Sequence, residues 1–148
     1  MSINVIISGS VEKSAQECVE RIKGQMESRA YRGANELRNA SLLVLRGQGG
    51  GRRYRVPGTK RYYTASAPGS PPAVRTGAFR LSWQPSAHVM FGSYISRVES
   101  DLRTDNGRYN LGELLENGTS KMAPRPHHDR IKEKALPEIM RIYDEPYF

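Results

Sequence analysis

Cysteine and long apolar runs are scarce in this 148-residue sequence. Its single cysteine, Cys18, excludes an intrachain disulfide and a zinc site built from cysteines. No stretch approaches the roughly 18 apolar residues of a membrane span. The first apolar stretch, Ile3–Ile7, is short, includes Asn4 and has no basic start, unlike a signal peptide. We therefore expect neither secretion nor membrane insertion.

Apolar residues are also below the usual share, at 37% of the chain. Three Phe, one Trp and eight Tyr are nevertheless too many aromatic residues for a wholly disordered protein. The length suits one folding unit, so residues 1–148 are expected to form a single domain with a modest core.

Acidic residues are missing from the middle of the chain. The whole sequence has 23 Lys and Arg against 15 Asp and Glu, a net charge of +8. None of the acids lies among the 62 residues between Glu36 and Glu99, where ten of the bases are found. Such a block attracts polyanions or an acidic protein surface, with a strong dependence on salt.

The amino-terminal pattern predicts a strand followed by a long helix. Residues 2–8 are rich in β-branched side chains, and Ser10 is a suitable N-cap for a helical apolar stripe over residues 11–46. A helix of that length would measure roughly 54 Å, too long for the diameter of so small a globule. Either Gly24 or Gly33 breaks the helix, or the helix packs on a neighbouring subunit.

The middle of the chain predicts an irregular arm followed by strands. Residues 47–72 contain six Gly and four Pro, and we take 47–75 as an extended basic arm. Residues 76–83 predict a short helix that becomes extended at its end. Residues 88–101 alternate like strands and are interrupted at Gly92.

The carboxyl-terminal part predicts further short elements and a second long helix. Residues 109–116 are compatible with a strand or a short helix, and the prolines of 121–126 predict an extended connector. Apolar spacing over 131–142 predicts an amphipathic helix that is kinked or restarted at Pro137. The predicted fold is α+β, with the amino- and carboxyl-terminal helices packed on a small antiparallel sheet beside a long basic arm.

Three adjacent polar residues invite a metal interpretation. His127 and His128 precede Asp129, but adjacent side chains are expected to point apart, so a site would need ligands from elsewhere. We interpret them as a polar helix start, with Asp129 as a cap or in the first turn. The prediction is that the chain holds no metal.

The other candidates for chemistry are also weak. Glycines 49–51 lack the Lys-Ser/Thr that completes a phosphate-binding loop. Cys18 lies on the apolar stripe, where a buried thiol is expected, and Glu113 with Glu116 are expected to be surface carboxylates. No catalytic constellation forms, so we predict a protein that is not an enzyme and has no cofactor.

The basic arm carries tyrosines among its charges. Its bases fit phosphates and its tyrosines fit stacked bases, as in sequence-independent DNA binding. The same residues fit a flexible arm that becomes ordered against another subunit, with Arg and Tyr as anchors. The candidate interface residues are Arg46, Arg52, Arg53, Tyr54, Arg55, Lys60, Arg61, Tyr62 and Tyr63.

Two segments resemble the tail-component family of long-tailed bacteriophages, the neck or tail-completion proteins that join head to tail. Residues 66–83, SAPGSPPAVRTGAFRLSW, resemble that family's Pro-rich stretch leading to Thr-Gly-x-Leu-Arg-x-Ser. Residues 114–126, LLENGTSKMAPRP, with Tyr109 before them, resemble its later Tyr-x-x-Leu-Glu-x-Gly-Thr block and the basic Pro-containing run that follows. The matching residues are Thr76, Gly77, Arg80, Ser82, Glu116, Gly118, Thr119, Met122, Pro124, Arg125 and Pro126. Phe79 and Trp83 adjoin the matches in the first segment.

The chain departs from that pattern at a few positions. Phe79 replaces a common leucine, Arg75 replaces an acid, and His127 replaces the aromatic residue that usually follows the last proline. The spacing from Tyr109 to Glu116 is longer than the pattern has.

Most of the motif positions have a structural interpretation. Thr76 is expected to cap the helix it begins, with Gly77 allowing a close backbone approach. Phe79 and Trp83 are expected to anchor that helix to the sheet, and Gly118 to adopt a positive φ. Pro124 and Pro126 stiffen the extended connector.

The resemblance implies a structural virion protein at the head-tail junction, made in the bacterial host cytoplasm. It implies a homo-oligomeric ring, six- or twelve-fold, beside head-connector and tail-terminator or tail-tube proteins, without contact to a membrane. The passing viral DNA is a further possible partner. The alternative function is sequence-independent DNA binding by the basic arm.

Overall fold

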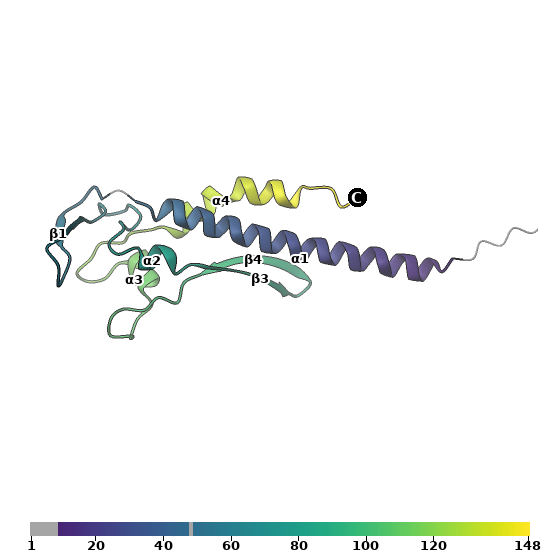
Figure 1. Ribbon diagram of the computed structural model, residues 1–148, viewed down its shortest axis with the longest axis horizontal. Coiled ribbons are helices and arrows are strands. Elements are labelled where there is room, and N and C mark those ends of the chain that lie inside the picture. The colour runs from purple at the N-terminus through teal and green to yellow at the C-terminus, as the bar shows by residue number, and fades with distance from the viewer. Residues whose placement is uncertain (1–8, 48) are drawn as a thin grey trace, which may run out of the picture.

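Helix α1, Val11–Val44, is the axis along which the rest of the chain is arranged (Figure 1). The computed structural model describes residues 9–47 and 49–148, so the strand predicted over residues 2–8 lies outside it. Ser10 is the N-cap as predicted, because its hydroxyl accepts a hydrogen bond from the Lys13 backbone N–H at 3.1 Å. At about 1.5 Å per residue the helix is roughly 50 Å long. The predicted α+β class is confirmed.

Neither glycine of α1 interrupts it, so the predicted break is wrong. Gly24 is exposed, with open space where a side chain would be. Gly33 is buried against β4, and a Cβ there would collide with Ser96 Oγ. That hydroxyl donates to the Ala30 carbonyl oxygen at 2.7 Å and lies 3.2 Å from the Tyr143 hydroxyl. Gly33 therefore permits a close approach between helix and strand.

Alanine at these two glycines is expected to have opposite effects. Gly24→Ala should raise the free energy of unfolding by roughly 0.5–1 kcal/mol, because alanine is the better helix former and nothing obstructs it. Gly33→Ala should lower the free energy of unfolding, because the new Cβ collides with Ser96 Oγ even though alanine is the better helix former. Adding Ser96→Ala to this variant should recover part of the lost stability. Denaturant titrations of the variants check this. Equal stabilisation by both alanines would contradict the close packing at Gly33.

Strands β3, Gln84–Met90, and β4, Ser93–Glu99, form an antiparallel hairpin that packs against α1. The register pairs Gln84 with Glu99 and Met90 with Ser93, which places Phe91 and Gly92 in a two-residue turn. The predicted interruption at Gly92 is thus confirmed as the hairpin turn. Both turn residues have positive φ, 50° and 75°.

The segment predicted as an irregular arm contains a second hairpin, so that prediction is wrong in this respect. Strands β1, Arg53–Arg55, and β2, Tyr62–Thr64, pair antiparallel. Backbone hydrogen bonds continue the ladder, from Gly51 to Ala65 at 2.8 Å and from Ala65 to Arg52 at 2.9 Å. Glycine is required at 49 and 51, because a Cβ at either would meet the backbone of the opposite strand.

Two short helices connect the hairpins to the carboxyl-terminal part. Helix α2, Ala78–Leu81, precedes β3, and helix α3, Leu111–Asn117, settles the choice between strand and helix over residues 109–116. Asn110 caps α3 by accepting from the N–H groups of Gly112 and Glu113.

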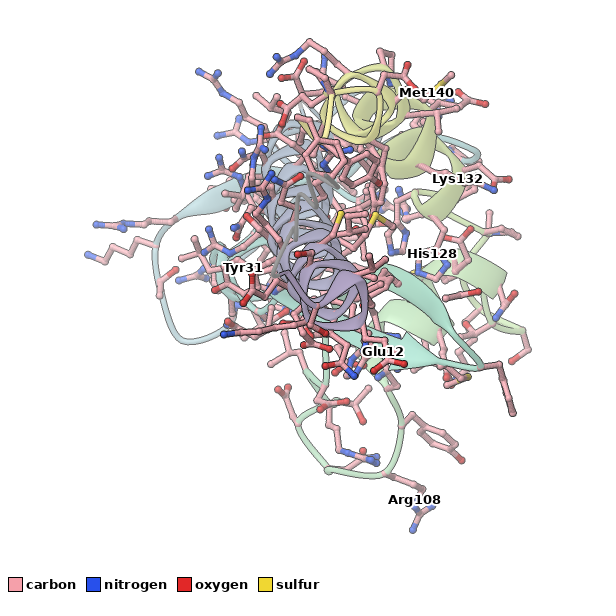
Figure 2. All side chains as sticks on the ribbon, turned by 90° about the vertical axis from the view of Figure 1, so that its right-hand side faces the viewer. Glu12, Tyr31, Arg108, His128, Lys132 and Met140 are labelled. Atoms are coloured by element: carbon pink, nitrogen blue, oxygen red, sulfur yellow. The ribbon has the colours of Figure 1, made fainter. Side chains whose placement is uncertain are left out.

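Helix α4, His128–Tyr143, runs beside α1, with Pro137 inside it and Asp129 in its first turn. Figure 2 looks along α1 from its amino-terminal end and shows α4 above it and β3–β4 below. The core is small: its buried apolar members are Ala40, Leu45, Trp83, Ile131 and Ala135. None of the described helices combines the length and the apolar character needed to cross a membrane.

A buried arginine holds the end of the chain against α1. Arg29 is only 3% exposed, and its guanidinium donates to the carbonyl oxygens of Tyr143 and Pro146, each at 3.0 Å. It also lies 3.9 Å from the centre of the Tyr147 ring. Sequence reasoning missed this residue, although it lies one helical turn from Gly33 on the buried face of α1.

Candidate subunit-docking site

The two family-like segments meet in space around three aromatic rings. Phe79 and Trp83 come from the first segment and His127 follows the second. The Phe79 and His127 ring centres are 5.5 Å apart, those of Trp83 and His127 are 5.9 Å apart, and both pairs are edge-to-face. His127 is fully buried, and its ring packs among these aromatic side chains. The Phe79 and Trp83 rings belong to a cluster that includes Val98 of β4, as the predicted anchoring to the sheet requires. Residues of α1 and α4 form most of that cluster, which the sequence did not predict.

Glu116 caps the amino terminus of α4 from a distance in sequence. Its Oε2 accepts the backbone N–H of His127 at 2.9 Å and that of His128 at 3.3 Å. Helix N-termini present unpaired N–H groups and favour a negative charge, so the carboxylate stabilises the start of α4. The prediction of a surface carboxylate is therefore wrong for Glu116, whereas Glu113 is exposed.

Both members of this contact have displaced pKa values. Partial burial disfavours the Glu116 carboxylate, but the His127 and His128 N–H groups outweigh it, so the pKa of Glu116 lies below its ordinary 4.5. Burial disfavours the imidazolium form of His127 and lowers its pKa below 6.5, despite the nearby Arg125 carbonyl oxygen and Glu116. The folded protein therefore keeps a carboxylate beside a neutral imidazole.

Stability should fall with acid through two groups, His127 from about pH 6.5 downward and Glu116 from about pH 4.5 downward. Below about pH 6.5 the unfolded chain protonates His127 more readily than the folded chain does, so the free energy of unfolding decreases as pH falls toward the folded-state pKa. The stability due to ionised Glu116 is present above pH 4.5 and is lost as pH falls through its lower, folded-state pKa. His127→Phe should flatten the upper range, and Glu116→Gln should flatten the lower one while costing about 1–2 kcal/mol at pH 7. Urea titrations across pH measure both, and an unchanged pH profile in either variant contradicts its assignment.

Glu116, His127 and His128 also form a group whose potential metal-ligand atoms lie within 4.8 Å of one another. Adjacent histidines do not point apart here, because their ring centres are 4.6 Å apart, which corrects the prediction. The fold already uses these atoms, however. His127 Nδ1 lies 3.0 Å from the Arg125 carbonyl oxygen, which only accepts, so Nδ1 carries a proton. The Glu116 oxygen caps α4. This chemistry supports a helix cap.

Backbone geometry at the glycines of both segments is partly as predicted. Gly118 has φ 76° and ψ −176°, which confirms the predicted positive φ. Gly77 has φ 86° and occupies the N-cap position of α2, where Thr76 was predicted. The space around Gly77 is open, so the predicted close backbone approach is wrong. The Thr76 hydroxyl instead accepts from the Ala78 N–H at 3.3 Å.

Polar side chains of the first segment join α2 to its neighbours. Arg80 donates from Nε to the Leu42 carbonyl oxygen of α1 at 2.8 Å. The hydroxyl of Ser82 lies 2.6 Å from that of Ser100, beyond the end of β4. In the second segment, Thr119 forms a bridge with Met122.

The base of the arm is tied to the second segment. The Arg125 guanidinium donates to the carbonyl and hydroxyl oxygens of the buried Ser66. The Gly69 N–H donates to the Pro124 carbonyl oxygen at 3.0 Å. Pro126 leads directly into His127 and α4. The second segment thus holds the arm on one side and α4 on the other.

The arm residues divide between two faces of the β1–β2 hairpin. Tyr54 and Tyr63 lie opposite each other with ring centres 5.9 Å apart. Because side chains alternate along a strand, Tyr62 lies on the other face, where the Arg53 guanidinium is 4.7 Å from its ring centre. The exposed bases of the region are Arg46, Arg52, Arg53, Arg55, Lys60, Arg61 and Arg75. Arginines accompany both groups of tyrosines, because the Arg52 and Arg75 guanidinium groups lie 5.8 and 5.9 Å from the ring centres of Tyr54 and Tyr63.

A cavity of about 570 Å³ lies between the arm and the body of the molecule. Apolar and aromatic side chains from segments far apart in sequence form much of its wall: Leu45, Tyr54, Tyr63, Phe79, Leu111 and Met122. Basic side chains also line it, including those of Arg75 and Arg125. Its size suits an apolar group of another molecule. Sequence reasoning missed the cavity because its walls meet only in the fold.

No protein-family model, curated protein or solved structure matches this chain.

Proposed function

We propose that the chain is a structural virion protein at the head-tail junction of a long-tailed bacteriophage, assembled as a ring between the head connector and the tail. The resemblance of residues 66–83 and 114–126 to tail-completion proteins supplies the role. In this proposal the chain catalyses no reaction.

The observation that carries the proposal is the unpartnered start of α1. The first ten residues of the helix are all exposed, and they include Val11 and Val19, which are 82% and 49% exposed. A helical segment of about ten residues is marginal in water by itself, and most helical stability in proteins comes from packing of an apolar face. Neighbouring copies in a ring would supply that packing, which residues 9–47 and 49–148 of a single chain do not.

The junction of the two family-like segments is consistent with a rigid ring subunit. Glu116, His127 and Trp83 join α2, α3 and the start of α4 through capping and ring contacts. The two polar residues of the junction have a structural role, because Glu116 accepts the backbone N–H of His127 at the start of α4. Such a body would present its arm and its long helix to neighbours in a constant orientation.

Particles provide the direct test of this role. Purified phage particles from the source of this gene should contain the chain in six or twelve copies. Particles made without it should accumulate as filled heads and separate tails, because the junction is incomplete. Complete infectious particles without the chain would overturn the proposal.

Sequence-independent DNA binding is the second candidate, and one observation favours it. The outer face of the β1–β2 hairpin carries Arg53, Arg55 and the 56%-exposed Tyr62, with no acid in the arm. Duplex binding should weaken steeply from low to physiological salt if these bases contact phosphates. Replacing Arg53 and Arg55 with glutamine should lower the affinity for duplex DNA and make it depend less on salt concentration. If the native chain does not bind duplex DNA at low salt, the DNA-binding function is excluded.

A further inference from the structure

An exposed apolar knob lies at the tip of the β3–β4 hairpin. Phe91 is 99% exposed, and its neighbours Val89 and Met90 are 59% and 46% exposed. Contiguous apolar groups on a protein surface commonly mark an interaction site.

The backbone at the tip is unfavourable for phenylalanine. Phe91 has φ 50°, in the left-handed region, followed by Gly92 at φ 75°. A two-residue turn with both φ values positive prefers Asn-Gly, because asparagine tolerates that conformation. The turn conformation therefore has a cost at Phe91, and no contact of its ring with the described part of the chain compensates for it.

The knob and the cavity lie at opposite ends of the hairpin. The seven residues of β3 extend roughly 24 Å from the root of the hairpin to its tip. The root follows α2, whose Phe79 and Arg80 line the cavity, and Figure 1 shows the tip pointing away from α2 and α3. One chain cannot place its own tip in its own cavity, but a second copy can.

Charge favours the same head-to-tail arrangement. Beyond the hairpin tip lies the start of α1 (Figure 1), whose first ten residues carry three acids and one base. The charged lining of the cavity is mainly basic: Arg75, Arg80, Arg103, Lys121 and Arg125, with Asp105 as the acid. The acidic end of one copy thus complements the basic end of the next.

We propose that Val89, Met90 and Phe91 of one copy insert into the cavity beside Met122 and Leu111 of the next copy. This inference rests on the proposed ring and names its subunit contact. A contact between two different surfaces repeats from copy to copy, and it closes into a ring where the rotation permits.

Phe91→Asn separates folding from association. Asparagine suits the turn, so the variant should unfold at a higher temperature than the native chain as a monomer. Its self-association, measured by sedimentation, should weaken by roughly tenfold or more, because a central aromatic anchor is lost. Leu81→Asn, at an apolar position that is also exposed, should leave association unchanged.

Disulfide trapping identifies the contact itself. On a Cys18→Ser background, Phe91→Cys and Met122→Cys chains are mixed and oxidised, and they should form a mixed disulfide dimer. Phe91→Cys with Met140→Cys, on the outer side of α4 (Figure 2), should not. If the native chain assembles but Phe91→Asn assembles equally well and no 91–122 disulfide forms, the contact is wrong and the ring stands. If the native chain stays monomeric at every concentration, both are overturned.

Discussion

Trp83→Ala is expected to lower the free energy of unfolding by about 3–5 kcal/mol, the largest effect of any substitution considered for this chain. The indole is 6% exposed and packs with Ala40, Leu45 and Ile131 in a core with few other large side chains. Its loss leaves a cavity and removes the edge-to-face contact with His127. A typical domain has only 5–15 kcal/mol of stability in total, so the variant should be largely unfolded at elevated temperature.

Thermal and urea unfolding of Trp83→Ala and Phe91→Ala provide the comparison. Both remove an aromatic ring, but Phe91 is 99% exposed, so its variant should change stability by no more than about 0.5 kcal/mol in the monomer. A Trp83→Ala chain as stable as the Phe91→Ala chain would show that the indole does not anchor the junction.

Gly118→Ala is expected to cost about 2 kcal/mol or more. Its φ of 76° and ψ of −176° belong to a region that is essentially restricted to glycine. An added Cβ would also lie 2.8 Å from the Met122 carbonyl oxygen and from the Pro124 nitrogen. The turn after α3 must therefore distort, and with it the connector that holds the arm and α4.

Gly107→Ala is the matched control for this substitution. Gly107 has φ 67° but open space around it, so its variant should show only the left-handed penalty of about 1–2 kcal/mol. Urea titration should rank Gly118→Ala as the less stable of the two. Equal losses would mean that the connector moves aside without cost.

The regular elements could be predicted from local signals. Ser10 with the apolar stripe predicted the start of α1. Strand alternation over residues 88–101, interrupted at Gly92, predicted strands there but missed residues 84–87 of β3. One of the two alternatives for the long helix, a break at Gly24 or Gly33, is wrong, because a glycine costs a helix only about 1 kcal/mol, which packing outweighs. At Gly33 the missing side chain is what allows β4 to approach.

The site was less accessible to sequence reasoning. The Gly and Pro residues of the arm predicted irregular structure, but the arm contains a hairpin. Its glycines at 49 and 51 permit close contact with the backbone of the opposite strand segment. Cys18 was expected to be buried, but it is exposed, because no part of the described chain covers the start of α1. The link from Glu116 to the start of α4 and the burial of Arg29 depend on contacts between distant segments, which spacing alone does not reveal.

Sedimentation equilibrium of the full-length chain over a wide range of concentrations tests the central claim most directly. The chain mass is 16.6 kDa, so the account predicts a closed assembly of about 100 or about 200 kDa, corresponding to six or twelve copies. A single species of 16.6 kDa at every concentration would contradict it.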